Sequence, residues 1–383
     1  MQPGDVYWSR FGHNAILVQD GARDTFYNYG FFDFDEPGFL LRFLQGKMHY
    51  RLVALPAADD LSSYAQEGRG VTLQWLAFDD RQATELARFL EWNARPENAR
   101  YRYDYFTDNC STKVRDALDR ALGGALRRQL QGRSRGMSYR WESLRLAASE
   151  PWLLLGIHAG LGPWTDRPLS RWDEGFVPMR LAEAVREVLL EDGSPLVSSE
   201  QRLLPQRLPP PASERPRLLG AFAGAGVLAA ALLLGLATRH RGWRRGATAL
   251  AVALWLFAST GGWLLAGLWA FTDHHAAWRN ENLLLFNPLA LGLLAALPAL
   301  WSGRPPAPWL RWLALLVLLA ALLAGFLKFL PSQVQDNLDW IAFWLPVHAA
   351  LARRLAHRPA IVPNALARGP GLPEHGGPAA PRS

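Results

Sequence analysis

The residues best suited to catalysis lie in the segment Asp108-Asn109-Cys110-Ser111-Thr112, which comes directly before a helical pattern. Cys110 is the only cysteine of the chain, so no intrachain disulfide can form. In the first turn of a helix, free backbone N–H groups and the helix dipole favour a thiolate. We therefore expect Cys110 to be a nucleophile, and the alternative is a buried structural cysteine.

A thiol nucleophile needs a base, and His13 is the best placed histidine before the apolar half of the chain. It lies in SRFGHNAILV, after a glycine and before an apolar strand. A rigid strand end suits a catalytic imidazole, although an ordinary hydrogen-bonded strand residue is the alternative. His49 and His158 fit packing or surface roles, so we select His13 as the base.

A catalytic imidazole also needs a polar partner for its second ring nitrogen. Asn28, in TFYNYGFFDF, lies on the strand expected to pair with the strand of His13. Its neighbour Tyr29 points to the opposite face because side chains alternate along a strand. We assign the orienting role to Asn28, with Asp33 and Asp35 as alternatives.

Periodic patterns predict the elements that position these residues. We expect strands at 6–19, 25–34, 51–55 and 71–76, and helices at 80–93, 111–126, 141–161 and 181–190. Together they predict an α+β domain over 1–193, with a core at 3–135 and a helical extension at 136–193. A Pro- and Ser-rich linker is expected at 194–216, and a disordered cytoplasmic tail at 357–383.

The second half of the chain, 217–356, is predicted to be a five-helix transmembrane domain. Its apolar blocks each approach the ~20 residues that span a bilayer. Arginines gather in the first and third loops between the apolar blocks and in the tail after the fifth block. Because basic loops stay in the cytoplasm, this predicts a multi-pass protein of the bacterial inner membrane with a periplasmic N-terminal domain and a cytoplasmic C-terminus. Residues 1–5 hold no export signal, so we expect a start shortly upstream, and the alternative is an inverted orientation. The blocks are 218–238, 247–271, 283–301, 309–330 and 338–355.

The formal net charge of +7 does not indicate nucleic-acid binding. The basic residues are spread along the first part and gather at the edges of the apolar blocks, where membrane orientation explains them. Asp273, His274 and His275 lie in one outer loop, but such a short set rarely binds a metal. We predict no metal and no cofactor, and expect this loop to contact lipid headgroups or the globular domain.

Four stretches together resemble a known family: WSRFGHNAI, YNYGFFDF, YRYDYFTDNCSTKVRDAL and LGPWTDRPLSRWDEGFVP. Their order and spacing are similar to the Lnb N-terminal periplasmic domain family, whose namesake is a bacterial lipoprotein N-acyltransferase. The similarity covers residues 3–180, and FTDHHAAWRNENLLLFNPL supports it in the membrane part. The arrangement also resembles circularly permuted papain-like (NlpC-type) enzymes, including the lecithin–retinol acyltransferase group, in which the histidine precedes the polar residue and the cysteine.

This resemblance implies a fold and a mechanism. The fold would be an α+β circularly permuted papain-like domain followed by an α-helical transmembrane bundle. The mechanism would be ping-pong transfer of a phospholipid acyl chain through a Cys110 thioester to an amine acceptor. In the namesake, that acceptor is the N-terminus of a diacylated lipoprotein. His13 would move the proton, and the backbone N–H of Cys110 would help to hold the oxyanion.

Five further residues complete the candidate site as expected substrate contacts: Tyr29, Tyr105, Asn109, Asp166 and His274. For Asp166 a structural role is equally open, and His274 would reach the site from the membrane side. The competing functions are a thiol hydrolase (a phospholipase, or a peptidoglycan amidase or endopeptidase) and a non-catalytic periplasmic scaffold. Five membrane helices argue against a peptidoglycan enzyme, whereas a phospholipase differs only in using water in place of the amine.

Overall fold

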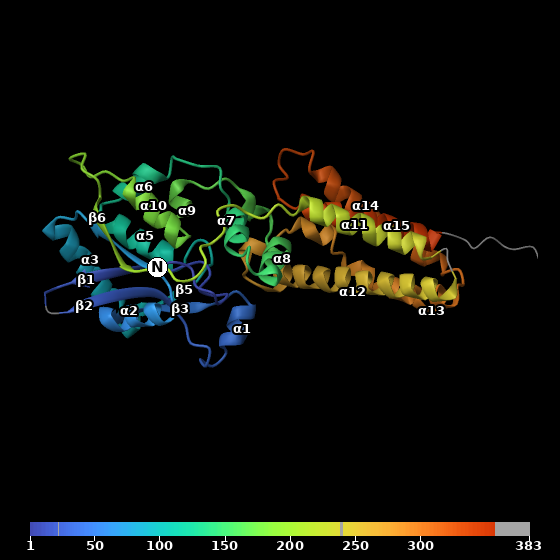
Figure 1. Cartoon of the computed structure of the whole chain (residues 1–383), viewed down its shortest axis with the longest axis horizontal. Helices are drawn as coiled ribbons and strands as arrows, with labels where there is room; N and C mark the ends of the chain where they lie inside the picture. The colour runs from blue at the N-terminus through green and yellow to red at the C-terminus, as the bar shows by residue number, and fades with distance from the viewer. Residues whose placement is uncertain (22, 238–239, 357–383) are drawn as a thin grey trace, which may run out of the picture.

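A computed structural model describes residues 1–21, 23–237 and 240–356. A mixed α/β part comes first, and an elongated bundle of apolar helices follows it (Figure 1). The tail predicted at 357–383 lies outside the described residues.

Four antiparallel strands form the main sheet, in the order β1-β2-β3-β5. They are β1 (Ala15–Gln19), β2 (Asp24–Phe31), β3 (His49–Pro56) and β5 (Arg100–Arg102). The pairing of β2 with β3 shifts between Asn28 and Phe31. Gly30 lies in this irregularity with a φ of 99°, a conformation that side chains disfavour. The end of β2 therefore bends at a position that only glycine occupies easily.

Helices cover both faces of this sheet, with α5 above it and α2 below it in Figure 1. Apolar residues at helical spacing give α3 and α5 their buried stripes, for example Leu86 and Leu90 in α3 and Val114 and Leu118 in α5. The predicted helix at 111–126 is two helices, because Gly124 adopts a left-handed conformation between them. The helices of this region are α1 (Phe39–Leu44), α2 (Ala57–Gln66), α3 (Asp80–Asn93), α4 (Pro96–Ala99), α5 (Cys110–Ala121) and α6 (Ala125–Leu130).

A second, two-stranded sheet pairs β4 (Val71–Leu76) with β6 (Val197–Leu204). The segment predicted as a linker at 194–216 thus contains a strand that belongs to the globular part. Its pairing partner lies far away in sequence, so the local Pro- and Ser-rich composition did not reveal it.

Residues 139–186 form a series of short helices. Pro151 ends the predicted helix at 141–161 early, because a proline begins a new helix more readily than it continues one. The elements are α7 (Tyr139–Leu146), α8 (Pro151–Gly160), η1 (Pro163–Asp166), α9 (Arg171–Glu174) and α10 (Pro178–Arg186).

The second part holds three helical stretches that are long and apolar enough to cross a membrane: Arg241–Phe271, Glu281–Ser302 and Pro308–Leu327. The first predicted block forms the shorter apolar helix α11 (Leu219–Gly235), and the last forms α15 (Leu338–Ala356), which carries charged residues at both ends. The remaining elements are α12 (Arg241–Phe271), η2 (His275–Ala277), η3 (Glu281–Leu284), η4 (Pro288–Ala296), α13 (Leu297–Ser302) and α14 (Pro308–Leu327).

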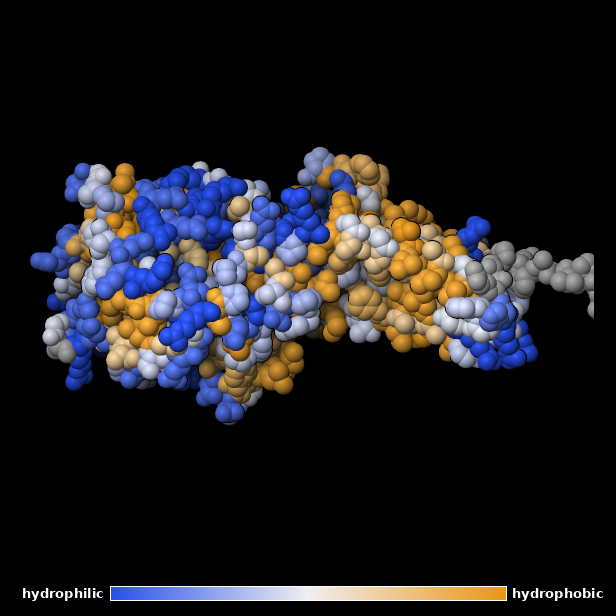
Figure 2. Space-filling view, in the orientation of Figure 1, coloured by the Kyte–Doolittle hydropathy of each residue, from blue (hydrophilic) through white to orange (hydrophobic). Residues whose placement is uncertain are grey.

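The bundle has an apolar outer band and a hydrophilic far end (Figure 2). Helices α11 and α15 lie side by side, and Gly226 permits their approach, since a Cβ there would meet the Cα of Phe343 at 2.8 Å. Small residues at such crossings are typical of membrane helices. Arg244 and Arg245 belong to the far end, where they lie against Gly303 and Trp301.

A buried polar network joins the two parts at the C-terminal end of α8. The last carbonyls of a helix have no partner within the helix. Here Asn280 Nδ2 donates to the carbonyls of Ala159 (2.8 Å) and Gly160 (3.0 Å), and Asn282 Nδ2 donates to that of Ala159 (2.9 Å). Gln335 Nε2 in turn donates to Asn280 Oδ1 at 2.8 Å. The outer loops of the bundle therefore cap a helix of the globular part.

The same helix end is bonded from the globular side by Arg140, which donates to the carbonyls of His158 and Leu161 and pairs with Asp166. Asp166 is nearly buried in that ion pair, so the structure assigns it the structural one of the two predicted roles. His158 Nε2 lies 2.9 Å from Asp339 Oδ2, at the start of α15. Polar contacts thus cross the junction on several sides of α8.

We predict that Asn282→Ala destabilises the whole protein. The substitution removes a buried donor from the α8 carbonyls, a loss that typically costs about 1–3 kcal/mol. Thermal unfolding of the full chain in detergent measures the effect, with Gln66→Ala, an exposed glutamine on α2, as the matched control. Equal unfolding temperatures for the two variants would show that the cap does not stabilise the junction.

Candidate active site

His13, Asn28 and Asp60 form a chain of hydrogen bonds at one end of the main sheet. His13 Nε2 lies 3.0 Å from Asn28 Oδ1, and Asn28 Nδ2 donates to Asp60 Oδ2 at 3.0 Å. Asn28 is fully buried and Asp60 is nearly so. Because the imidazole bonds to Asn28 through Nε2, its Nδ1 remains for another partner. Asn28 thus occupies the position expected of an orienting residue, whereas the alternative, Asp33, accepts the N–H of Asp35 in an exposed loop.

Cys110 is the first residue of α5. Asn109 caps the helix, and its Oδ1 accepts the N–H groups of Ser111 and Thr112, both at 2.9 Å. This cap leaves the N–H of Cys110 itself available. The Asn109 amide also donates to the carbonyls of Tyr105 and Phe176, so it is fixed from two sides. Asn109, predicted as a substrate contact, therefore positions the start of the cysteine helix.

Two backbone segments place Cys110 beside the histidine. A Cβ added at Gly30 would lie 3.3 Å from the Cβ of Cys110, so the bend of β2 makes room for the cysteine. The backbone N–H of Asn14, the residue after His13, is close enough to the thiol to lower its pKa. The Asn14 side chain donates to Ser111 Oγ at 3.0 Å and so ties this segment to α5. The start of α5 therefore packs against the segments that carry His13 and Asn28, and we call Cys110, His13 and Asn28 the thiol cluster.

Tyr101 adds a hydroxyl group to this cluster. Its Oη is buried without a hydrogen-bond partner among the described residues, and it lies 4.0 Å from the Cβ position of Gly30. A buried hydroxyl normally finds a partner. Tyr101 is held on the strand β5, where Lys113 lies over its ring at 4.7 Å. The Tyr101 hydroxyl is therefore a buried donor near Cys110 that no described residue uses.

Burial shifts the pKa of both the cysteine and the histidine in the direction that favours the neutral form. Burial raises the pKa of the Cys110 thiol, against hydrogen bonds from the N–H groups of Asn14 and Ser111. Burial also lowers the pKa of His13 to about 4. Our expectation that the helix start favours a thiolate is therefore wrong for the resting site, because lost hydration outweighs the backbone N–H groups.

The other predicted substrate contacts lie in different places. Tyr29 is buried in the core, and its hydroxyl donates to Asn93 Oδ1 at 2.7 Å, so it does not face the site. Tyr105 is exposed, and its ring stacks on that of His274 with centroids 6.0 Å apart. His274 Nε2 bonds to the carbonyl of Phe43 at 3.1 Å. The outer loop therefore contacts the globular part, which was one of its two predicted roles.

The remaining histidines of the globular part stand apart from this cluster. His49 pairs with Arg102 in the sheet, and His158 is buried at the junction with Asp339. Among the described residues, neither is bonded to the residues around Cys110, and the choice of His13 as the base stays a prediction.

Sequence reasoning missed Asp60 and Tyr101. Ala57, Asp60 and Tyr64 are the buried residues of α2, so Asp60 is a carboxylate on the apolar stripe of an amphipathic helix. A charge on such a stripe is rarely buried without a partner, which was a usable signal. Tyr101 gave no signal, because its role depends on where β5 joins the sheet.

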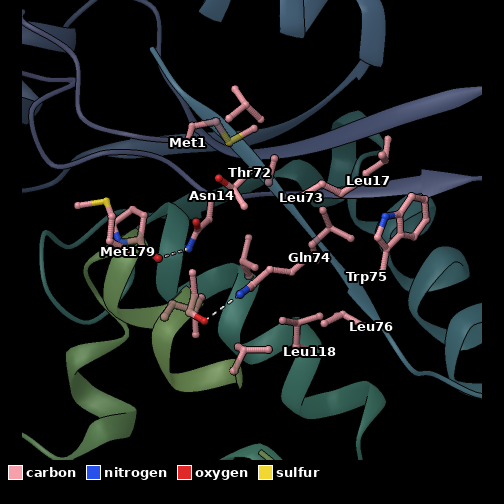
Figure 3. Close-up of a pocket in the computed structure, with 18 of the residues that line it drawn as sticks. Met1, Asn14, Leu17, Thr72, Leu73, Gln74, Trp75, Leu76, Leu118 and Met179 are labelled. Atoms are coloured by element: carbon pink, nitrogen blue, oxygen red, sulfur yellow. Dashed lines mark hydrogen bonds between the residues drawn. The ribbon is translucent and has the colours of Figure 1, made fainter. Parts of the chain in front are cut away.

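A large cavity lies beside the cluster and is not lined by Cys110, His13 or Asn28. Its volume is about 1040 Å³, and it separates β1 from β4 (Figure 3). Asn14 lies at one end and Gln74 donates to the carbonyl of Ala182 at 3.0 Å along its wall. The cavity is bounded by two strand edges and is distinct from the thiol cluster.

A globular domain with a Cys–His–Asn cluster, bonded to a bundle of apolar helices, defines a multi-span membrane protein with a buried thiol site. Residues 1–149 match the Lnb N-terminal periplasmic domain, and residues 222–358 match the Lnb transmembrane domain. The chain belongs to the Lnb family, and its N-terminal domain is periplasmic. No curated protein and no solved structure matches it.

We predict that the alkylation rate of Cys110 by iodoacetamide rises with pH without a plateau between about pH 5 and 8. Only the thiolate reacts, and a raised thiol pKa delays its formation to alkaline pH. Because the chain has one cysteine, the mass of the intact protein reports the reaction directly. A plateau with a midpoint below pH 6 would instead indicate a resting thiolate–imidazolium pair.

Proposed function

We propose that the protein is a membrane-bound thiol acyltransferase that moves an acyl chain from a phospholipid to an amine through a Cys110 thioester. The observation that carries the proposal is the 3.0 Å hydrogen bond from His13 Nε2 to Asn28 Oδ1, beside the only thiol of the chain. The order of His13, Asn28 and Cys110 also supports a circularly permuted papain-like fold for the domain, which is part of the same proposal.

In the first half-reaction, Cys110 attacks the carbonyl carbon of the phospholipid ester. Neutral His13 accepts the thiol proton as the S–C bond forms, which is how a base activates a thiol that is protonated at rest. The C–O bond then breaks, and His13 returns the proton to the lysophospholipid oxygen. The backbone N–H of Cys110 and the hydroxyl of Tyr101 donate to the oxyanion.

In the second half-reaction, an amine attacks the thioester. The N–C bond forms and the C–S bond breaks, and His13 passes the amine proton to the departing thiolate. The proposed acceptor is the N-terminal amine of a diacylated lipoprotein. A thioester suits this step because amines attack it readily and it retains acyl-transfer potential.

The bundle supports this function by holding the site at a membrane surface. Arg244 and Arg245 lie at the end of the bundle away from the globular domain, and basic loops stay cytoplasmic. This supports a cytoplasmic C-terminus and a thiol near the outer leaflet, which are both part of the proposal. Both proposed substrates are anchored in that leaflet, so tethering raises their effective concentration at the site.

We expect intact wild-type protein to gain the mass of one acyl chain after incubation with a defined phospholipid. The gain should be removed by hydroxylamine, and it should be absent from Cys110→Ala and His13→Ala. No acyl mass and no released lysophospholipid would eliminate the lipid acyltransferase function. Lysophospholipid and free fatty acid without acylated amine, in the presence of a diacylated lipopeptide, would identify a phospholipase instead.

We also predict that Tyr101→Phe slows thioester formation roughly 10²-fold, as the loss of one oxyanion donor does in other acyl-transfer enzymes. Tyr27→Phe, which removes a hydroxyl whose neighbouring charges are Glu91 and Asp20 and not Cys110, should acylate at the wild-type rate. Single-turnover mass spectrometry measures both rates, and thermal unfolding checks that both variants fold. A wild-type rate for Tyr101→Phe would exclude its hydroxyl from the reaction.

A further inference from the structure

Helix α1 presents an apolar surface that the protein itself does not cover. Leu40, Leu41 and Leu44 are 67%, 60% and 57% exposed, and Phe34 just before the helix is 58% exposed. We call these four residues the α1 foot. The helix has no buried residue, so packing within the chain does not explain its composition. A contiguous exposed apolar patch of this kind indicates a binding surface.

The α1 foot lies at the level where the bundle leaves the membrane. Asp273 comes two residues after the end of α12, and its N–H donates to the carbonyl of Gln45, which ends α1, at 2.8 Å. The six residues of α1 span only about 9 Å. In Figure 1, α1 projects beside the end of α12, and in Figure 2 the same position is apolar. The foot therefore continues the apolar surface of the bundle.

An aromatic strip extends the foot towards α8. Trp8 lies 6.0 Å from Phe34 and 4.6 Å from Tyr7 between ring centroids, and Tyr7 lies 6.1 Å from Trp152, at the start of α8. Trp8 and Trp152 are both more than half exposed. Exposed tryptophan and tyrosine rings concentrate where membranes meet water. The exposed Lys47, which follows α1, adds a positive charge suited to phosphate headgroups.

Stacked rings connect the foot with the thiol. Phe39 of α1 stacks on Phe32 with centroids 5.8 Å apart, Phe32 lies 4.9 Å from Tyr50, and Tyr50 lies 4.2 Å from Tyr103. Tyr103 is close enough to Cys110 for a thiolate there to raise the pKa of the Tyr103 hydroxyl. These ring contacts form a continuous aromatic path between the foot and the surroundings of Cys110.

We propose that the α1 foot inserts into the outer leaflet and receives the acyl chain of a phospholipid, which then reaches Cys110 along the aromatic side chains. The insertion follows from the geometry of the surface alone. Only the delivery of the chain to Cys110 rests on the proposed acyltransferase function.

A single-cysteine reporter tests the insertion without any catalysis. The reporter is bimane attached to Leu41→Cys in the full-length Cys110→Ala protein, reconstituted in vesicles of phosphatidylcholine and phosphatidylglycerol. The matched control is Leu189→Cys, which is 49% exposed beside α6 at the end away from the bundle. Lipids with a doxyl group high on the acyl chain should quench position 41 about twofold or more and leave 189 unchanged.

If iodide in water quenches both positions equally and the labelled lipid quenches neither, the foot does not lie in the membrane. If position 41 is shielded from iodide and also from the labelled lipid, a protein surface, such as a second copy of this chain, covers the foot. Either result overturns the proposal.

Delivery of the acyl chain is tested in the catalytic protein by changing Leu40, Leu41 and Leu44 together to Gln. Thioester formation from vesicle phospholipid should slow roughly tenfold or more, since three apolar side chains no longer enter the leaflet. Acylation by a soluble short-chain ester should remain unchanged, and Leu189→Gln should match the wild type with both donors. An unchanged rate with vesicles overturns the delivery role. Failure of the wild type with both donors would instead eliminate the acyltransferase function and leave the quenching result standing.

Discussion

The amide of Asn28 is fully buried, so both of its polar atoms must be bonded, and this constraint organises the globular domain. Its oxygen holds His13 at the entry to β1, and its nitrogen holds Asp60 on α2. Strands β1 and β2 and helix α2 therefore have one relative position in which both polar atoms of the Asn28 amide are hydrogen-bonded. The bend at Gly30 follows directly in β2 and admits Cys110 from above. One amide side chain thus links His13, Asp60 and the bend that admits Cys110.

Hydrogen bonds to otherwise unpaired polar groups also connect the globular domain to the bundle. The end of α8 is partly buried, and side chains from the outer loops of the bundle bond its carbonyls. On the opposite side of the junction, the His274 loop closes on Tyr105, whose carbonyl holds the Asn109 cap of the cysteine helix. A continuous set of contacts therefore runs from the membrane loops to the first turn of α5. This arrangement fixes the orientation of the thiol with respect to the membrane surface.

Sequence patterns predicted correctly those helix ends that depend on neighbouring residues alone. The helix at 80–93 agrees with α3 at both ends because an Asp79 capping box and a clear apolar stripe mark it. Asn109 before an apolar helical stripe located the start of α5 within one residue. The predicted strand at 6–19 was too long, because residues before Ala15 form turns in which Gly12 has a positive φ. Other features depend on tertiary contacts, which a short stretch of sequence does not contain. They are the pairing of β6 with β4, the bond between Asn28 and Asp60 of α2, and the raised pKa of the Cys110 thiol.

The capped end of α8 also sets an order for assembly. Gln335 and Asp339 follow α14 in the chain, yet they bond to Leu161 and His158 of the globular domain. The carbonyls of this helix therefore receive their last partners only after most of the bundle has been synthesised and its final outer loop has crossed the membrane. A chain that ends before this loop lacks the bundle's partners for Leu161 and His158. Completed insertion of the bundle thus adds the last bonds to a helix that belongs to the globular domain.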